Sequence, residues 1–202
     1  WEFMQLQRKL FFSILLLPMM LFSESFSPFT GKITGNKVRM RFSADLDSEI
    51  LKQFNRGDLV LVIGEKDNFW KIAPPKDIKG YVFRSYLIND TIEANRVNLR
   101  LAPNTDSLVI GQLQQGQKIS GKICAQDNKW IETDLPDGTG FYIAKEYIDN
   151  IGKAEYFSEI QKRKEEVENL LTTAITSAKE ELQKPYEKMN IQEPVSEFEV
   201  II

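Results

Sequence analysis

The sequence predicts a mainly β protein: two small β-barrels in tandem, followed by a long α-helix. Three observations lead to this fold class. One sequence unit occurs twice, each copy holds short β-type runs separated by turn residues, and a stretch rich in Glu, Lys and Leu without Gly or Pro follows the second copy. The chain has 202 residues, of which 42% are hydrophobic and 27% charged, as in an ordinary globular protein.

The N-terminal residues 1–25 have the layout of a secretory signal peptide. Arg8 and Lys9 precede an apolar run that reaches Phe22, and the small residues Ser23 and Ser25 follow it. The run is shorter than the roughly 20 residues of a transmembrane helix. An uncleaved anchor or a buried helix is the alternative. We expect an exported protein of the periplasm or cell envelope that contacts the membrane only through this segment if it stays uncleaved.

The body of the chain contains one unit twice, from Val38 to Leu87 and from Val97 to Ile148. The matching residues are Val38 with Val97, Arg41 with Arg100, Gly57 with Gly116, Trp70 with Trp130, Tyr81 with Tyr142, and Tyr86 with Tyr147. The spacing between partners slips by one residue on either side of the Trp pair, in polar segments that tolerate insertions. We therefore predict a duplicated domain.

Each copy predicts its own set of short strands. In the first copy, β-type runs occupy residues 59–63, 69–72 and 80–83, and in the second they occupy residues 116–119, 130–133 and 141–143. Short strands at close spacing, with no helix between them, are typical of a small β-barrel. These runs predict one barrel at residues 33–90 and a second at residues 95–150.

Both copies resemble the bacterial SH3 domain (SH3b). The resemblance rests on Val-x-x-Arg, a later Gly, Asn-x-Trp, and an ending in aromatic-Val-x-x-x-Tyr-Leu. The first copy matches at Arg41, Gly57, Trp70 and residues 80–87, and the second at residues 97–103 and 113–116. Two positions depart from the family: Ala44 stands where Pro is frequent, and Phe141 where Gly is usual. The resemblance implies SH3-like barrels that bind ligands.

The C-terminal part of the chain predicts an amphipathic helix over residues 153–184. Apolar residues recur there at spacings of three, four or seven, which places them on one helix face. Pro185 ends the pattern. The apolar face could pack over the two barrels or form a coiled coil, and the pattern does not separate these alternatives. Residues 185–202 form a tail without a recognisable motif.

Composition argues against catalysis. The chain has no His and one Cys, so on its own it cannot build a Ser-His-Asp triad, a Cys-His pair or a His-ligated zinc site. The single Cys124 fits a buried apolar position in a strand. The net charge of −3 is unlike that of a general nucleic-acid binder. We therefore expect a non-enzyme without cofactor, metal or nucleic-acid partner.

Aromatic and arginine side chains are the candidate ligand-binding residues, because SH3-like domains bind extended peptides in aromatic grooves. The candidates are Arg41, Trp70, Tyr81, Tyr86, Arg100, Trp130, Tyr142 and Tyr147. Tyr86 and Tyr147 are the stronger groove candidates, since a phenol can offer its hydroxyl to a ligand. The alternative places the rings in the core. Arg41 and Arg100 could bind a carboxylate, or pair internally with Asp47 and Asp106.

The resemblance implies a binding protein whose paired domains hold a peptidoglycan peptide or an envelope protein. Two weak sites in one chain raise the apparent affinity for such a ligand. SH3b pairs behind a signal peptide also resemble adhesins of chlamydia-like bacteria, for which the partner would be a host surface protein. A third alternative is an accessory targeting region of a larger cell-wall enzyme.

Overall fold

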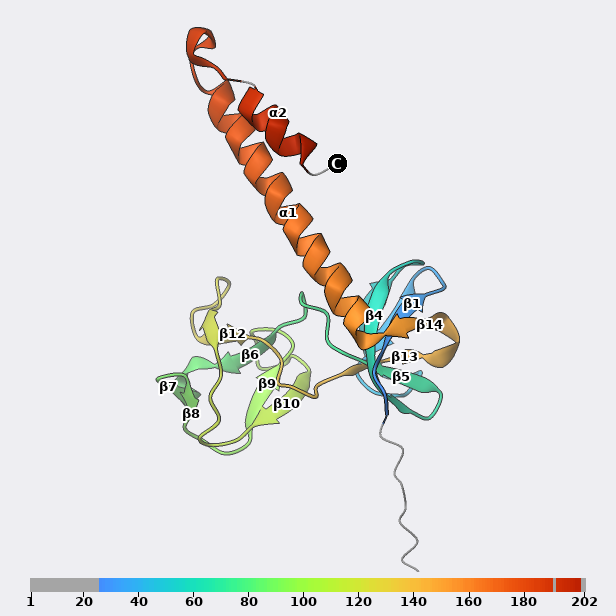
Figure 1. Ribbon diagram of the computed structural model, residues 1–202. Helices are drawn as coiled ribbons and strands as arrows, with labels where there is room; N and C mark the ends of the chain where they lie inside the picture. The colour runs from blue at the N-terminus through green and yellow to red at the C-terminus, as the bar shows by residue number, and fades with distance from the viewer. Residues whose placement is uncertain (1–25, 191, 201–202) are drawn as a thin grey trace, which may run out of the picture.

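The computed structural model describes residues 26–190 and 192–200, which form two β lobes and a long helix that projects from one of them (Figure 1). The predicted export signal at residues 1–25 lies outside the described residues. In the described part of the chain, no helix is both long and apolar enough to cross a membrane.

The first lobe is built on a seven-stranded sheet with the strand order β14-β1-β4-β5-β13-β2-β3. Its strands are β1 (Phe29–Ile33), β2 (Val38–Arg41), β3 (Ile50–Phe54), β4 (Leu59–Lys66), β5 (Phe69–Ile72), β13 (Phe141–Ala144) and β14 (Ile148–Lys153). Buried and half-buried side chains alternate along the first part of β4, with Val60 and Val62 in the core. This alternation explains why the apolar run after Gly57 forms a strand with one buried face.

The second lobe is built on a five-stranded sheet with the order β10-β9-β6-β12-β11, accompanied by the hairpin β7-β8. Its strands are β6 (Gly80–Phe83), β7 (Leu87–Ile88), β8 (Thr91–Ile92), β9 (Val97–Arg100), β10 (Val109–Leu113), β11 (Gly121–Ile123) and β12 (Trp130–Thr133). Among the described strands, neither large sheet closes on itself, since each has two end strands with one neighbour. Two closed barrels are therefore not confirmed.

The two copies exchange a strand. Strand β6 belongs to the first copy but pairs with β12 and β9 in the second lobe. Strand β13 belongs to the second copy but pairs with β5 and β2 in the first lobe. The chain crosses between the lobes at residues 73–79 and again at residues 134–140 (Figure 1). The two sheets therefore do not correspond to the predicted domains, residues 33–90 and 95–150, because each sheet contains a strand from the other range. The domain boundaries stay a prediction from the sequence repeat.

Strand pairing also corrects the predicted alignment of the two tryptophans. Phe83 and Ala144 each directly precede a 3-10 turn, η1 (Arg84–Tyr86) and η2 (Lys145–Tyr147). Trp130 pairs with Phe83, and Phe69 pairs with Ala144. Trp130 therefore corresponds to Phe69 and not to Trp70. The inserted residues all lie before β12, in the turn that precedes it, and the two crossing segments have equal length.

Each lobe has its own hydrophobic core. The first comprises Phe29, Ile33, Val38, Met40, Phe54, Val60, Val62, Ile72, Phe141, Ile143 and Ile148. The second comprises Val82, Ile92, Val97, Leu99, Ile110, Leu113 and Ile119. Phe42 and Leu135 pack against both cores and so connect the lobes. Cys124 is buried with a free thiol, as the sequence predicts.

Of the two core positions on the exchanged strands, Val82 and Ile143 are similar in size, whereas Gly80 and Phe141 differ strongly. Phe141 on β13 is 1% exposed and lies opposite Ile72 in the first lobe. The equivalent residue on β6 is Gly80, opposite Thr133 in the second lobe. A Cβ atom at Gly80 would lie 2.7 Å from Cδ1 of Leu99, so the second lobe has no space for a ring there.

The predicted C-terminal helix is confirmed as α1 (Ala154–Leu182), which begins directly after β14. The buried Thr30 on β1 fixes its start: the Thr30 hydroxyl accepts a hydrogen bond from the Phe157 N–H and donates one to the Lys153 carbonyl. The first turns contact β1, β4 and β14, and the rest projects away from both lobes (Figure 1).

The predicted tail contains the 3-10 turn η3 (Tyr186–Lys188) and a short helix, α2 (Gln192–Glu199), which packs against α1 (Figure 1). Since α1 contacts strands of the first sheet, it does not lie across both lobes as one alternative expected. A coiled coil stays a prediction. Val167, Leu171 and Ile175 on α1 are each about two-fifths exposed, which leaves part of the predicted apolar face uncovered.

Candidate functional site

Two equivalent grooves, one on each lobe, hold most of the polar and aromatic side chains that could bind a ligand. Groove A, of about 330 Å³, is lined by Asn36, Lys37, Val38, Arg39, Arg41, Leu46, Phe69, Ala144, Glu146 and Tyr147. Groove B, of about 360 Å³, is lined by Phe83, Tyr86, Ala94, Asn95, Arg96, Val97, Asn98, Arg100, Thr105 and Trp130. Nine of the ten lining residues of each groove occupy matching positions in the two copies, and Glu146 and Ala94 are the exceptions.

Each groove is assembled from both copies, because the strand exchange carries the 3-10 turns across. The Tyr147 turn of the second copy lies in groove A, where the Tyr147 carbonyl accepts a 3.1 Å hydrogen bond from the Thr34 N–H. The Tyr86 turn of the first copy lies in groove B, where the Tyr86 carbonyl accepts a 2.9 Å bond from the Glu93 N–H. These matched bonds hold both tyrosines in the same orientation.

Tyr86 and Tyr147 are the most accessible of the predicted groove residues. Their exposed fractions are 44% and 40%, whereas a ring in the core would be nearly inaccessible. The neighbouring Glu146 carboxylate raises the pKa of Tyr147, first through hydrogen bonding and then through charge. The Tyr147 O–H is thus directed to Glu146, and the phenol oxygen can still accept a hydrogen bond from a ligand.

Arg41 and Arg100 have the same internal partner in the two grooves. The Arg41 guanidinium donates a 2.7 Å hydrogen bond to the Ser48 carbonyl, and Arg100 donates a 2.7 Å bond to the Ser107 carbonyl. The predicted ion pairs with Asp47 and Asp106 are absent from the described salt bridges, so that prediction was wrong about the partner. Each arginine stabilises the loop after its strand while its side chain lines the groove.

Sequence reasoning missed the basic residues at the groove entrance, Lys37 and Arg96. Both have a positive φ, 55° and 57°, in the left-handed region that non-glycine residues rarely adopt. Strained backbone of this kind costs on the order of 1–3 kcal/mol and is frequent at functional sites. The signal was present in the matching tripeptides Asn36-Lys37-Val38 and Asn95-Arg96-Val97.

Both grooves are rich in cationic side chains. Groove A combines Lys37, Arg39 and Arg41 with one acid, Glu146. The basic residues that line groove B are Arg96 and Arg100, and no Asp or Glu is among its described lining residues. A basic groove with an aromatic wall suits an extended ligand that carries carboxylates, since Arg can bind a carboxylate through two parallel hydrogen bonds.

The two tryptophans have different roles. Trp130 is 4% exposed and forms the floor of groove B, with its ring edge-to-face against Phe83 at 5.3 Å. Trp70 does not line either groove. It packs edge-to-face against Phe29 at 5.1 Å, and the Lys145 ammonium lies 4.7 Å from its ring centre. Trp70 therefore supports the attachment of the exchanged η2 turn.

Tyr81 and Tyr142 also lie outside the two grooves, at equivalent places on β6 and β13. Tyr142 lies between Lys71 and Arg41 on the neighbouring strands, and Tyr81 lies between Glu132 and Arg100. The Tyr81 hydroxyl donates to Glu132 at 3.3 Å. Burial, and then the Glu132 charge, raises the pKa of Tyr81. We assign both tyrosines to strand pairing.

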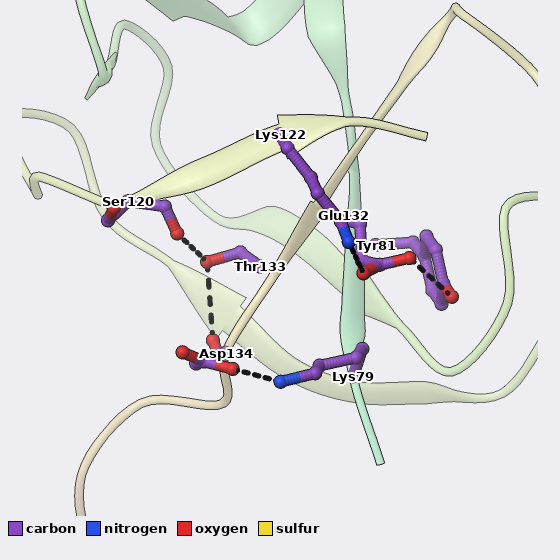
Figure 2. A network of polar contacts seen from close by, with 7 residues as sticks. All are labelled: Lys79, Tyr81, Ser120, Lys122, Glu132, Thr133 and Asp134. Carbon is purple, nitrogen blue, oxygen red and sulfur yellow. Dashed lines mark hydrogen bonds and ion pairs between the residues drawn. The ribbon is translucent and has the colours of Figure 1, made fainter. Parts of the chain in front are cut away.

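Tyr81 belongs to a polar network at the edge of the second lobe (Figure 2). Glu132 also forms an ion pair with Lys122 at 3.2 Å, and Asp134 forms one with Lys79 at 2.5 Å. Lys79 lowers the pKa of Asp134, through a hydrogen bond first and through its charge second. Because Lys79 and Tyr81 come from the first copy and their partners from the second, the network stabilises the exchanged strand.

A larger hollow, about 890 Å³, lies between α1 and the first sheet. Phe157 and Ile160 of α1 line it together with Pro74 and Pro75 of the first crossing segment, and an ion pair of Lys76 with Glu165 spans it. The second lobe has no counterpart to α1. We therefore place the duplicated site in grooves A and B.

Within residues 26–190 and 192–200, no group of three or more Asp, Glu or Cys side chains could hold a metal ion.

Comparison with known proteins identifies part of the chain. Residues 36–88 match the bacterial SH3 domain family. The "Putative N-acetylmuramoyl-L-alanine amidase YrvJ" of Bacillus subtilis (strain 168) is 23% identical over 145 residues, which cover 62% of this chain and 27% of that protein. The chain thus aligns with about a quarter of its relative. No solved structure matches it. The chain contains a bacterial SH3 domain sequence at residues 36–88.

Proposed function

We propose that the chain is an exported, non-catalytic binding protein whose grooves A and B hold peptides of the bacterial cell wall. The main support is the pair of equivalent grooves. Each is lined by a tyrosine, an arginine and a basic residue whose backbone has a positive φ. The match to the bacterial SH3 domain family and the relative named as a putative N-acetylmuramoyl-L-alanine amidase support the same class of ligand.

The groove chemistry fits a stem peptide of peptidoglycan. Such a peptide is short and extended and carries free carboxylates, which Arg41 and Lys37 in groove A and Arg100 and Arg96 in groove B could bind. The tyrosine ring offers an apolar wall beside these cations. Because peptidoglycan repeats the same peptide many times, two grooves on one chain would increase retention through avidity.

A second candidate is a targeting region of a larger cell-wall enzyme. The relative from Bacillus subtilis favours it, because the alignment covers 27% of a protein that is named as an amidase. The grooves would then concentrate an enzyme on its substrate. An envelope protein or a host surface protein as the partner, as in an adhesin, is the remaining alternative from the sequence.

The test is retention of residues 26–202 on purified peptidoglycan sacculi. We expect retention of the unaltered protein, and a loss of about tenfold or more in affinity for the double variant Tyr86→Ala/Tyr147→Ala, because truncating an aromatic anchor typically costs 2 kcal/mol or more. Tyr186→Ala is the matched control, since Tyr186 on η3 is 87% exposed and outside both grooves.

Sacculi stripped of their stem peptides by an amidase form the second arm of this test. We expect them to lose the unaltered protein, because the proposed ligand has been removed. Equal retention on stripped sacculi would contradict peptide recognition, and equal retention of the double variant would contradict the groove assignment. Failure of the unaltered protein to bind any sacculi would favour a protein partner.

A further inference from the structure

The strand exchange is reciprocal in its backbone pairing. In the first lobe, the Lys145 N–H donates to the Asn68 carbonyl at 2.9 Å, and in the second lobe the Arg84 N–H donates to the Lys129 carbonyl at 2.7 Å. The tyrosine turns make the matched bonds to Thr34 and Glu93 described above. Each lobe therefore contains the final strand and 3-10 turn of the other copy. The backbone hydrogen bonds that hold this strand and turn are the same in both lobes.

The two cores distinguish the exchanged strands from each other. In an unexchanged chain, β13 would return to the second lobe and place Phe141 beside Leu99, where even a Cβ atom at Gly80 would be 2.7 Å from that side chain. Strand β6 would return to the first lobe and place Gly80 opposite Ile72, leaving the volume of the Phe141 ring empty. Overpacking costs about 1–3 kcal/mol, and a Phe-sized cavity about 3–5 kcal/mol.

The crossing segments also favour the exchanged path. Pro74 and Pro75 lie one residue after the end of β5, and consecutive prolines hold the backbone extended. The Lys71 ammonium donates to the Gly138 carbonyl at 2.8 Å, which attaches the second crossing segment to the first lobe. Leu135 on that segment packs against both cores.

We propose that this exchange is encoded in the two cores and makes the copies a single, inseparable binding unit. Groove A then consists of the basic strand of the first copy and the Tyr147 turn of the second, and groove B has the opposite composition. In the exchanged structure, neither groove is formed by one copy alone. The proposal rests on strand pairing and side-chain volume, and it does not depend on the identity of the ligand.

Engineered disulfides test the pairing directly, in a Cys124→Ala background that removes the native thiol. Lys71 lies opposite Tyr142 in the exchanged structure, whereas it would lie opposite Tyr81, the equivalent residue of β6, in an unexchanged chain. Directly opposed residues of antiparallel strands have Cα atoms about 4.5–5.5 Å apart, within the roughly 4.4–6.8 Å found in disulfides. We expect Lys71→Cys/Tyr142→Cys to oxidise to an intramolecular disulfide, and Lys71→Cys/Tyr81→Cys to remain reduced.

A second set of variants tests the pairing in the second lobe. It keeps the proposal testable if the Lys71 variants do not fold. Glu132 lies opposite Tyr81, so Glu132→Cys/Tyr81→Cys should form the bond and Glu132→Cys/Tyr142→Cys should not. Circular dichroism of each reduced variant verifies that it is folded. Oxidation of the Lys71/Tyr81 and Glu132/Tyr142 pairs would overturn the proposal. A disulfide-linked dimer would also overturn it, because the exchange would then join two chains.

Discussion

Two basic residues in strained backbone carry the clearest functional information at the scale of single residues. Lys37 and Arg96 occupy the turns that enter β2 and β9, both are exposed, and both have a positive φ near 55°. A glycine would adopt this conformation without steric cost. Because a long cationic side chain occupies both places, we expect the two charges to contribute to ligand binding.

We predict that Lys37→Gly/Arg96→Gly weakens retention on sacculi while stability changes by less than about 1 kcal/mol. Glycine relieves the left-handed backbone strain, which raises the stability of the folded state by roughly 1 kcal/mol. It also raises the entropy of the unfolded chain, which lowers the stability by about the same amount. Urea unfolding and sacculus binding separate the two effects. Asp67→Gly is the matched control, because Asp67 has φ 52° and lies outside both grooves. A Lys37/Arg96 variant that binds normally would remove these residues from the site.

Asp134 gives a prediction about acid stability. Because Lys79 lowers its pKa in the folded protein, the pair contributes stability above the ordinary carboxyl range, and this contribution is lost as the pH falls through the lowered value. Asp134→Asn should therefore be less stable than the unaltered protein at neutral pH, with a small difference because Asp134 is exposed. Thermal unfolding between pH 7 and pH 2 should show the difference vanishing at the acid end. A constant difference would contradict the Lys79 assignment.

Among the elements, the exchanged strands β6 and β13 determine how the molecule is built. The sequence predicted the duplicated unit, the short strands and the long helix, because hydrophobic pattern and turn residues are local signals. It did not predict which copy supplies the last strand of each lobe, since either strand satisfies the same local pattern and the same register. The sequence does show Phe141 at the position where the first copy has Gly80. The effect of the larger side chain can be judged only when the residues that surround it in the core are known.

We predict that the position shared by Gly80 and Phe141 does not tolerate a change in size. Phe141→Ala should lower the free energy of unfolding by about 3–5 kcal/mol, the usual cost of deleting a buried ring. Gly80→Ala should also destabilise, because its Cβ would lie 2.7 Å from Leu99. Gly64→Ala is the control: its Cβ would make ordinary contacts at 3.6 Å with Lys71. Denaturant unfolding measures all three, and a neutral Gly80→Ala would contradict the tight fit.

At the scale of the whole molecule, the exchange implies that the lobes unfold together, although each has its own core. Strand β13 cannot leave the first lobe without disturbing the second crossing segment, where Leu135 packs against both cores. Within residues 26–202, Trp70 reports on the first lobe and Trp130 on the second. Variants with a single tryptophan, Trp130→Phe and Trp70→Phe, therefore observe each lobe separately.

We predict that Phe141→Ala, which alters the first core, shifts the urea midpoint of both reporters by the same amount. Two independent tandem domains would behave differently: the Trp70 signal would shift and the Trp130 signal would not. Comparing the shift within each single-tryptophan background removes the effect of the reporter substitution itself. Coincident transitions are the standard sign of one cooperative unit. A shift confined to Trp70 would show that the lobes are separable despite the crossing strands, and groove B would then be expected to survive the loss of the first core.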